Sequence, residues 1–567
     1  MPGQPSPRSF GLDDLADAPR WWEGIVAGLC AAVYLWIMQA QTPNGDGRVY
    51  IRIVESGSIV WNPNHLLMAP IGLAWYCLLQ AIGLDWSIFA SLKALSGLAT
   101  VATVVLVYRA IPLRSSGLRA LTVAAIFFSA DFLSMAIAEE YFVVQMPVLA
   151  ALLGLGMRVV QGDKPSMEPR RLATMGVLAA VAAAISVNNA LLAIALGPLV
   201  AYRPGDRDWH TVGRRLVQLW GPGIVVGVPI LLGCYFVSGT DHGLLSWLTA
   251  YQGDPDGGGG ALYGIRWDPQ GLIIGAARLV YGFVNSLVVL GQLGAAAKSL
   301  LFGQPIEFHL DIVGAASMAL LFATIGSLAA GFFWWAIRHG YRMPLVRFGL
   351  GWIGAYLLFN FIFSDISDQF WFQVLLPLWV LLAIFVSNRT AASSEGSRGL
   401  PWSHGAFVVS VLLLSVGNTL SVAAPRAFND TAAFSASFQT LLTDGDLLIT
   451  TGWDDLSWVV PRERSQVKRV LLMELAMQQY KDHHSLDDLP ATVDAQLRQG
   501  GRVLLARVYD KDHEGRPWEQ LTKLGWPRHR IQALFSSFDN RVVGTVGGVV
   551  IRQLEPRPAS SASASGS

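Results

Sequence analysis

The sequence predicts a polytopic α-helical membrane protein with a small C-terminal α/β domain. Hydrophobic residues make up 53% of the 567 residues and charged residues only 14%. Such a composition over this length is typical of chains that cross a membrane many times. Apolar stretches of helix length run from Trp22 to Ala424, and the character of the sequence changes at Pro425. The expected parts are a cytoplasmic N-terminal segment (1–21), a transmembrane domain (22–424), an extracytoplasmic α/β domain (425–556) and a disordered tail (557–567).

Charge and cysteine content argue against a nucleic-acid-binding protein and against a fold held together by cysteines. The net charge of +1 indicates no nucleic-acid partner. The three cysteines lie in apolar stretches without CxxC spacing, so we expect neither a disulfide framework nor a cysteine metal site. Residues 1–20 show no signal-peptide cleavage pattern, which favours a retained first helix.

The apolar stretches have the length that a membrane crossing needs. Each extends over roughly 16–26 residues, enough to cross about 30 Å of hydrocarbon. A longer stretch, Leu172–Tyr202, is interrupted by Asn188 and Asn189 and is interpreted as two short passes. The other expected spans are Gly24–Ala40, Trp86–Tyr108, Ala120–Ala138, Phe142–Val159, Leu219–Val237, Ile312–Ile337, Phe348–Phe363, Phe372–Ser387 and Gly405–Ala423.

Loop charge gives the orientation, because loops rich in Lys and Arg stay in the cytoplasm. Five loops are basic, and they hold Arg109 to Arg119, Arg158 to Arg171, Arg203 to Arg215, Arg338 to Arg347, and Arg389 to Arg398. Placing all five inside requires that His65–Ile82 does not cross and that Gly271–Leu301 makes no net crossing. The prediction is about eleven passes plus interfacial helices, with the C-terminal domain outside. Four other loops then face outside: Asn44–Asn64, Glu139–Tyr141, Thr240–Gln270 and Ser364–Trp371.

The C-terminal part reads as a small α/β domain with its own core. Asp446–Thr451 and Arg502–Val508 are short apolar runs typical of buried strands. Val467–Tyr480 and Trp518–Leu524 are interpreted as helical.

Acidic residues stand out in the first two outer loops. Asp46 has glycine on both sides, which leaves its carboxylate accessible but is also typical of a turn aspartate. Glu139 and Glu140 follow the third span. They either favour the start of the next helix or hold a cation or a substrate amine.

Polar residues inside the spans are the next candidates. Lys93 and Asp131 either pair with each other, or Lys93 faces a cavity and binds an anionic head group. Asn188 and Asn189 either join two helices by hydrogen bonds or mark a binding site at a broken helix.

The long outer loop Thr240–Gln270 combines aromatic rings, acids and an arginine, Arg266. Such side chains suit a sugar or a polyprenyl phosphate. Four consecutive glycines from Gly257 favour a mobile lid, and a solvated loop without a role is the alternative.

In their order, these pieces resemble the GT-C superfamily of membrane glycosyltransferases, and in particular its bacterial branch similar to protein O-mannosyltransferases. In that fold an acidic outer loop follows the first helix, then come a non-crossing interfacial helix, two spans and a second acidic loop. The motifs that carry the resemblance are Gly45-Asp46, Asn62-Pro63-Asn64-His65-Leu66, Ala138-Glu139-Glu140-Tyr141, Ser186-Val187-Asn188-Asn189 and the stretch Gly445–Gly452. Two departures are the Asn-Pro-Asn-His run and Gly47, which replaces the second acid of the first loop.

The resemblance implies a role for each candidate. Asp46 would be the general base, and Glu139 and Glu140 would bind the acceptor or a metal. The candidates for the donor phosphate are Arg48, Arg52, Lys93 and Arg266, and the residues expected to line the cavity are His65, Tyr141, Asn188 and Asn189. No cofactor is required by the motifs, and a divalent metal stays open because Gly47 lacks a carboxylate.

The expected activity is transfer of a sugar from a polyprenyl-phosphate donor to an acceptor hydroxyl at the outer face of the cytoplasmic (inner) membrane. The partners would be the lipid bilayer, the donor lipid and a glycan, protein or lipid acceptor. The alternatives are a transporter or flippase of lipid-linked glycans, which would need polar residues near the midplane, and a non-catalytic envelope scaffold.

Overall fold

In the computed structural model, most of Met1–Phe428 forms one compact helical unit, and Asn429–Ser567 falls in a second unit. The tail after residue 557 and the first 20 residues lie outside the described part of the chain. The structure describes residues 21–40, 45–55, 57, 65–162, 168–201, 208–239, 243–249, 269–288, 312–338, 340–363, 371–394, 402–424, 440–451, 467–472, 475–476, 486–509, 518, 521–522, 525–546 and 549–557.

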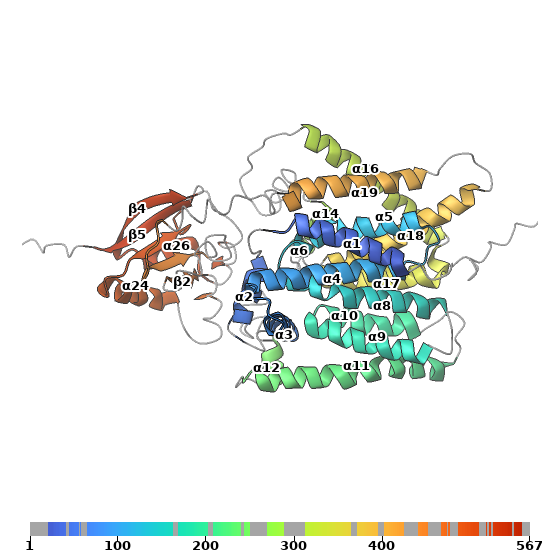
Figure 1. The fold of residues 1–567 in the computed structure, drawn as a ribbon, viewed down its shortest axis with the longest axis horizontal. Helices are drawn as coiled ribbons and strands as arrows, with labels where there is room; N and C mark the ends of the chain where they lie inside the picture. The colour runs from blue at the N-terminus through green and yellow to red at the C-terminus, as the bar shows by residue number, and fades with distance from the viewer. Residues whose placement is uncertain are drawn as a thin grey trace, which may run out of the picture. The chain divides into compact units, whose positions relative to one another are not determined.

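The helical unit is a bundle of long apolar helices (Figure 1). Seven described helices are long and apolar enough to cross a membrane, or eight if the bent pair α5–α6 is one span. The expected spans fall on helices of this bundle. Its described elements are α1 (Trp21–Ile37), α2 (Gly45–Glu55), α3 (Met68–Ala81), α4 (Ile88–Ala110), α5 (Ser116–Phe127), α6 (Ala130–Ala136), α7 (Tyr141–Val144), α8 (Met146–Gln161), α9 (Glu168–Ile185), α10 (Asn189–Ala201), α11 (Trp209–Val237), α12 (Leu244–Thr249), α14 (Pro269–Leu287), α16 (Ile312–Arg338), η3 (Gly340–Arg342), α17 (Pro344–Phe363), α18 (Phe372–Ser394), α19 (Trp402–Asn418) and the π-helix η5 (Thr419–Ala423).

The prediction of a loop over Asn44–Asn64 is wrong for its first part. Gly45–Glu55 forms helix α2. One face of α2 is buried through Tyr50, Ile51, Ile53 and Val54. The hydroxyl of Tyr50 donates a hydrogen bond of 2.8 Å to the carbonyl of Met68 at the start of α3. Packing of this apolar face therefore outweighs the turn-forming tendency of its glycines.

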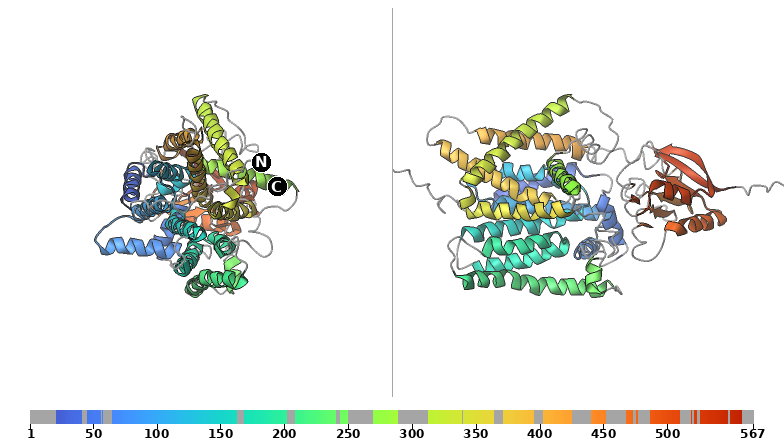
Figure 2. Two further views of the ribbon diagram at one scale, coloured as in Figure 1. Left: turned by 90° about the vertical axis from the view of Figure 1, so that its right-hand side faces the viewer. Right: turned by 180° about the vertical axis from the view of Figure 1, so that it is seen from behind.

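Helix α3 was expected not to cross the membrane, and its geometry agrees with that. Its 14 residues extend only about 21 Å, less than the thickness of the hydrocarbon layer. Figure 1 shows α3 end-on while α4 and α8 lie in the plane of the view, and Figure 2 shows it lying across the direction of the bundle.

The expected span Ala120–Ala138 is broken, since α5 and α6 meet at an angle of 73°. Side chains from two distant helices form hydrogen bonds at this break. Asn418 donates to the carbonyl of Phe128 at 2.6 Å and to that of Leu287 at 2.8 Å. Trp379 donates to the hydroxyl of Ser129 at 3.2 Å.

The second unit contains a five-stranded sheet in the order β2-β1-β3-β5-β4. Strand β1 pairs in parallel with β2 and β3, and β5 pairs antiparallel with β3 and β4. One face, with Leu447, Ile449 and Val503, packs against residues of α24 and α26. The described elements are β1 (Leu447–Thr450), β2 (Lys468–Leu471), η7 (Leu486–Asp488), α24 (Leu489–Arg498), β3 (Val503–Ala506), α26 (Arg528–Leu534), β4 (Phe538–Val546) and β5 (Val549–Pro556).

The two expected strands are present as β1 and β3, but the expected helix Val467–Tyr480 is wrong at its start. Lys468–Leu471 is strand β2, which lies at the edge of the sheet. An edge strand has only one hydrogen-bonded neighbour and tolerates charged residues such as Lys468, so its pattern resembles that of a helix.

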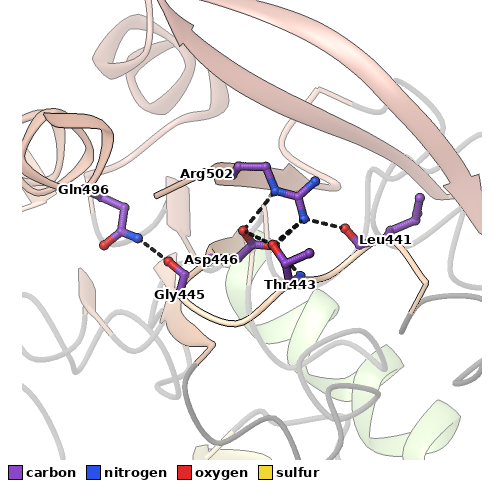
Figure 3. A network of polar contacts seen from close by, with 6 residues as sticks. All are labelled: Leu441, Thr443, Gly445, Asp446, Gln496 and Arg502. Carbon is purple, nitrogen blue, oxygen red and sulfur yellow. Dashed lines mark hydrogen bonds and ion pairs between the residues drawn. The ribbon is translucent and has the colours of Figure 1, made fainter. Parts of the chain in front are cut away.

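A buried aspartate joins the ends of β1 and β3 (Figure 3). Asp446 accepts hydrogen bonds from Thr443 N at 2.7 Å and Thr443 Oγ1 at 2.9 Å. Arg502 donates to it through Nε at 3.0 Å and Nη2 at 2.6 Å. These hydrogen bonds raise the pKa of Arg502 above its ordinary value. The Gly445-Asp446 pair therefore has a structural role, which is to fix two parallel strands at their amino ends.

Candidate functional site

The N-terminus of α2 packs directly against the second acidic loop. A Cβ at Gly47 would lie 2.8 Å from Cδ of Glu139 and would overlap its carboxylate oxygen. Since adjacent Cα atoms are 3.8 Å apart, the Cα of Asp46 lies within about 8 Å of the Glu139 carboxyl carbon. Asp46 is thus the second residue of a helix, where the helix dipole favours a negative charge. The side chain of Asp46 lies outside the described residues, so its role stays a prediction.

Backbone and side-chain contacts join the two acidic segments. Ala40 N donates to the carbonyl of Ile137 at 2.9 Å. Lys93 Nζ donates to the carbonyl of Ala40 at 3.1 Å and lies 4.4 Å from the ring centroid of Phe89. The ammonium of Lys93 also attracts the carboxylate of Glu139. Lys93 and Glu139 therefore lie in the same region, within range of an electrostatic attraction.

The interpretation of Lys93 and Asp131 as a mutual pair is wrong. Both residues are described, and no ion pair joins them, whereas the acid that interacts with Lys93 is Glu139. Asp131 lies on α6 beyond the break and is buried. The bend between α5 and α6, which the apolar pattern does not show, places Asp131 away from the position that a straight helix would give it.

The two glutamates are held inside the bundle. Glu139 is fully buried, and Glu140 is 4% exposed. Ser96 on α4 donates to the backbone carbonyl of Glu140 at 3.2 Å. Burial of a carboxylate is costly without a compensating charge or hydrogen bonds, and Lys93 is a nearby charge that offsets part of this cost for Glu139.

His65 lies where the expected Asn-Pro-Asn-His segment meets the broken helix α9–α10. Its Nδ1 is 3.1 Å from the carbonyl of Ile185, and Leu67 N donates to Ala184 O at 3.0 Å. Its ring packs edge-on against Phe142 with 5.6 Å between centroids. Burial lowers the pKa of His65 to about 4, so this histidine is neutral near pH 7.

Asn188 and Asn189 have different surroundings although both are buried. Asn189 donates to Gln145 Oε1 and to Ala182 O, and it accepts a hydrogen bond of 2.5 Å from Tyr356. It therefore joins α8, α9, α10 and α17. Neither side-chain atom of Asn188 has a hydrogen-bond partner.

The remaining predicted residues cannot be placed. The side chains of Arg48, Arg52 and Tyr141 lie outside the described residues. The same holds for residues 250–268 of the expected lid, including Arg266. Among the side chains that the structure does describe, no group of three or more His, Cys, Asp or Glu residues is arranged to hold a metal. Metal use thus stays open.

Sequence reasoning missed three buried polar residues near this site, namely Gln145, Tyr356 and Gln373. Gln145 precedes α8, Tyr356 lies on α17, and Gln373 lies in the first turn of α18. The signal was present, since glutamine is costly inside an apolar span.

Comparisons with known proteins bear on the fold. No protein-family model matches the chain, and no curated protein matches its sequence. The solved structure of ArnT from Cupriavidus metallidurans bound to undecaprenyl phosphate is similar, with a TM-score of 0.52 and 12% identity over 93% of this chain and 97% of that chain. The oligosaccharyltransferase of Archaeoglobus fulgidus in the apo form has a TM-score of 0.50 and 12% identity over 95% of this chain and 75% of that chain.

Both of these proteins are GT-C superfamily glycosyltransferases. The chain is therefore a multi-pass membrane protein with the GT-C fold, as its motifs predicted. The resemblance to the O-mannosyltransferase branch stays a prediction.

Proposed function

We propose that the chain is an inverting glycosyltransferase that moves a sugar from a polyprenyl-phosphate donor to an acceptor hydroxyl. The observation that carries the proposal is the convergence of α2, which bears Asp46, with Glu139 and Lys93 in a bundle of GT-C fold. The solved structure of similar fold that contains undecaprenyl phosphate supports a lipid-linked donor.

In the proposed reaction, Asp46 accepts the proton of the acceptor hydroxyl while that oxygen attacks the anomeric carbon. The bond between this carbon and the phosphate oxygen breaks, and the electron pair leaves with the polyprenyl phosphate. The phosphate needs a cationic cradle and not an acid. Lys93 is the described candidate for this cradle, and Arg48, Arg52 and Arg266 are the others.

The site would face the outside of the cytoplasmic membrane, together with the C-terminal domain. Support comes from the five basic loops, which the positive-inside rule places in the cytoplasm. A reporter fused after Ala424 should accordingly be active only outside the cytoplasm.

The test is Asp46→Asn in the purified full-length protein. We expect transfer from a polyprenyl-phosphate sugar to fall by about 100-fold or more, with donor binding retained, because only proton acceptance is lost. Glu55→Gln is the matched control, since it removes an exposed carboxylate from the other end of α2. Equal activity of Asp46→Asn and wild type would refute Asp46 as the base, whereas absence of transfer by wild type would favour the transporter or scaffold alternatives.

A further inference from the structure

Among the described residues of the helical unit, two buried amides make no hydrogen bonds through their side chains. They belong to Asn188, at the break between α9 and α10, and Gln373, in the first turn of α18. Asn188 is 2% exposed, and Gln373 is fully buried. In addition, the Nε2 of Gln145 is buried without a partner. Leaving such groups unpaired inside a protein is costly, so each one calls for an explanation.

Contacts across four helices join these three residues. Gln145 is bonded to Asn189, the chain neighbour of Asn188, and Asn189 is bonded to Tyr356 on α17. Trp352, one turn before Tyr356, donates to the backbone carbonyl of Gln373 at 3.1 Å. The residues that bear the open amides, Gln145, Asn188 and Gln373, named the amide cluster here, thus belong to segments that pack against one face of α17.

The cluster lies inside the bundle. Trp352 lies about three helical turns before Phe363, the end of α17, which corresponds to roughly 16 Å along the helix. Gln373 therefore begins α18 well below the level at which α17 ends. Such polar atoms need a partner other than bulk water, and the hydroxyl groups of a bound ligand can supply one.

The free atoms define the chemistry of that ligand. They comprise three amide nitrogens, which donate, and two amide oxygens, which accept. The residues that bear these atoms are uncharged, which suits hydroxyl groups because each hydroxyl both donates and accepts. The rings of Tyr356 and Trp352, 6.5 Å apart, lie beside the cluster and offer apolar surface.

We infer that the amide cluster binds the sugar of the lipid-linked donor and that this sugar is a neutral, polyhydroxylated ring. The inference rests on the proposed function. It deepens that function, because it separates recognition of the sugar by Asn188, Gln373 and Gln145 from recognition of the phosphate by Lys93. The neighbouring Asn189, whose amide is fully bonded, has only a structural role.

The experiment compares binding of undecaprenyl phosphate and of mannosyl-phosphoryl-undecaprenol to the full-length protein in lipid nanodiscs. Wild type should bind the glycosylated lipid about tenfold more tightly, which corresponds to one or two hydrogen bonds. Asn188→Leu and Gln373→Met should each bring the ratio of the two affinities close to one and leave the affinity for undecaprenyl phosphate unchanged. Both variants should also melt a few degrees higher than wild type without ligand, because an unpaired amide has been removed.

Asn189→Leu is the matched control and should melt lower, because it breaks three hydrogen bonds. Variants of Asn188 and Gln373 that melt lower and keep the preference would overturn the inference, since the amides would then be structural. Equal binding of both lipids by wild type would overturn the inference but leave the proposed donor lipid intact. Binding of neither lipid would refute the proposed function and this inference with it.

Discussion

Two sets of buried polar groups, one in each unit of this protein, differ in whether they are hydrogen-bonded. In the C-terminal unit, both oxygens of Asp446 are bonded, to Thr443 and to Arg502 (Figure 3). In the helical unit, the amides of Asn188 and Gln373 are equally buried but bonded to nothing. A group that folding alone requires should have its partners in the fold. The difference therefore indicates that Asp446 serves stability and that the amide cluster serves binding.

The variant expected to have the largest effect removes the carboxylate of Asp446. Asp446→Asn leaves Arg502 without its ion-pair partner, and we expect the C-terminal unit to lose about 3 kcal/mol of stability. Hydrogen exchange of the β1 and β3 amides in the full-length protein would measure the loss. Since Asn188→Leu is expected to act in the opposite direction, the two variants test the comparison from both sides.

The matched control is Asp494→Asn, which also removes an aspartate paired with an arginine in the same unit. Asp494 and Arg498 form an i,i+4 pair on the surface of α24, with side chains 43% and 79% exposed. Surface pairs of this kind contribute only about 0.5 kcal/mol. If both variants changed hydrogen exchange by the same amount, burial would not be what makes the Asp446 network important.

The sequence predicted the class and most helices because long apolar runs leave few alternatives in a membrane. It failed where tertiary contacts decide local structure. Gly45–Glu55 looked like a glycine-rich loop, and only its packing on α3 makes it a helix. The bend at Ser129 accepts hydrogen bonds from Asn418 and Trp379, which are hundreds of residues away in the chain. No local pattern near residue 129 contains that information.

The sequence predicted only part of the candidate site. Glu139 and Lys93 could be named because charges in apolar surroundings are conspicuous, but their proximity could not, since it depends on how distant segments pack. Gln373 was overlooked although an amide in an apolar span is a signal, and the missing contacts of its side chain are visible only in the structure. Asp46 was named from its motif, and its side chain remains to be placed experimentally.

A second variant sharpens the account of how the acidic segments meet. Gly47→Ala adds one methyl group where the buried side chain of Glu139 lies, so this carboxylate must move away from its place beside α2. We expect transfer activity to fall by about 100-fold, because displacement of a catalytic group by about 1 Å has effects of this size. Activity would be measured with saturating donor in purified protein of unchanged melting temperature.

Gly97→Ala is the control for Gly47→Ala. Gly97 lies on α4, and a Cβ there would meet nothing within 4 Å. The extra methyl group should leave activity unchanged and stabilise the helix slightly. Full activity of Gly47→Ala would show that Glu139 can leave its position without consequence, and the convergence of the two acidic segments would lose its functional meaning.

The smallest expected effect concerns His65, which gives the helical unit a pH dependence of its own. Burial lowers the pKa of His65 from 6.5 to about 4. Below pH 6.5 the unfolded chain binds a proton at this residue, whereas the folded protein does not until the pH approaches 4. Stability from the neutral imidazole is therefore present above pH 6.5 and is lost as the pH falls. The loss should amount to about 2 kcal/mol between pH 6.5 and pH 5.

Melting temperatures of wild type and His65→Gln across this range would isolate the contribution, because glutamine does not titrate and the other ionisable groups are common to both proteins. The difference between the two curves should shrink as the pH falls, since only wild type loses this contribution. A difference that stays constant with pH would mean that His65 is not held neutral at the break between α9 and α10, and the buried contact with Ile185 would then be wrong.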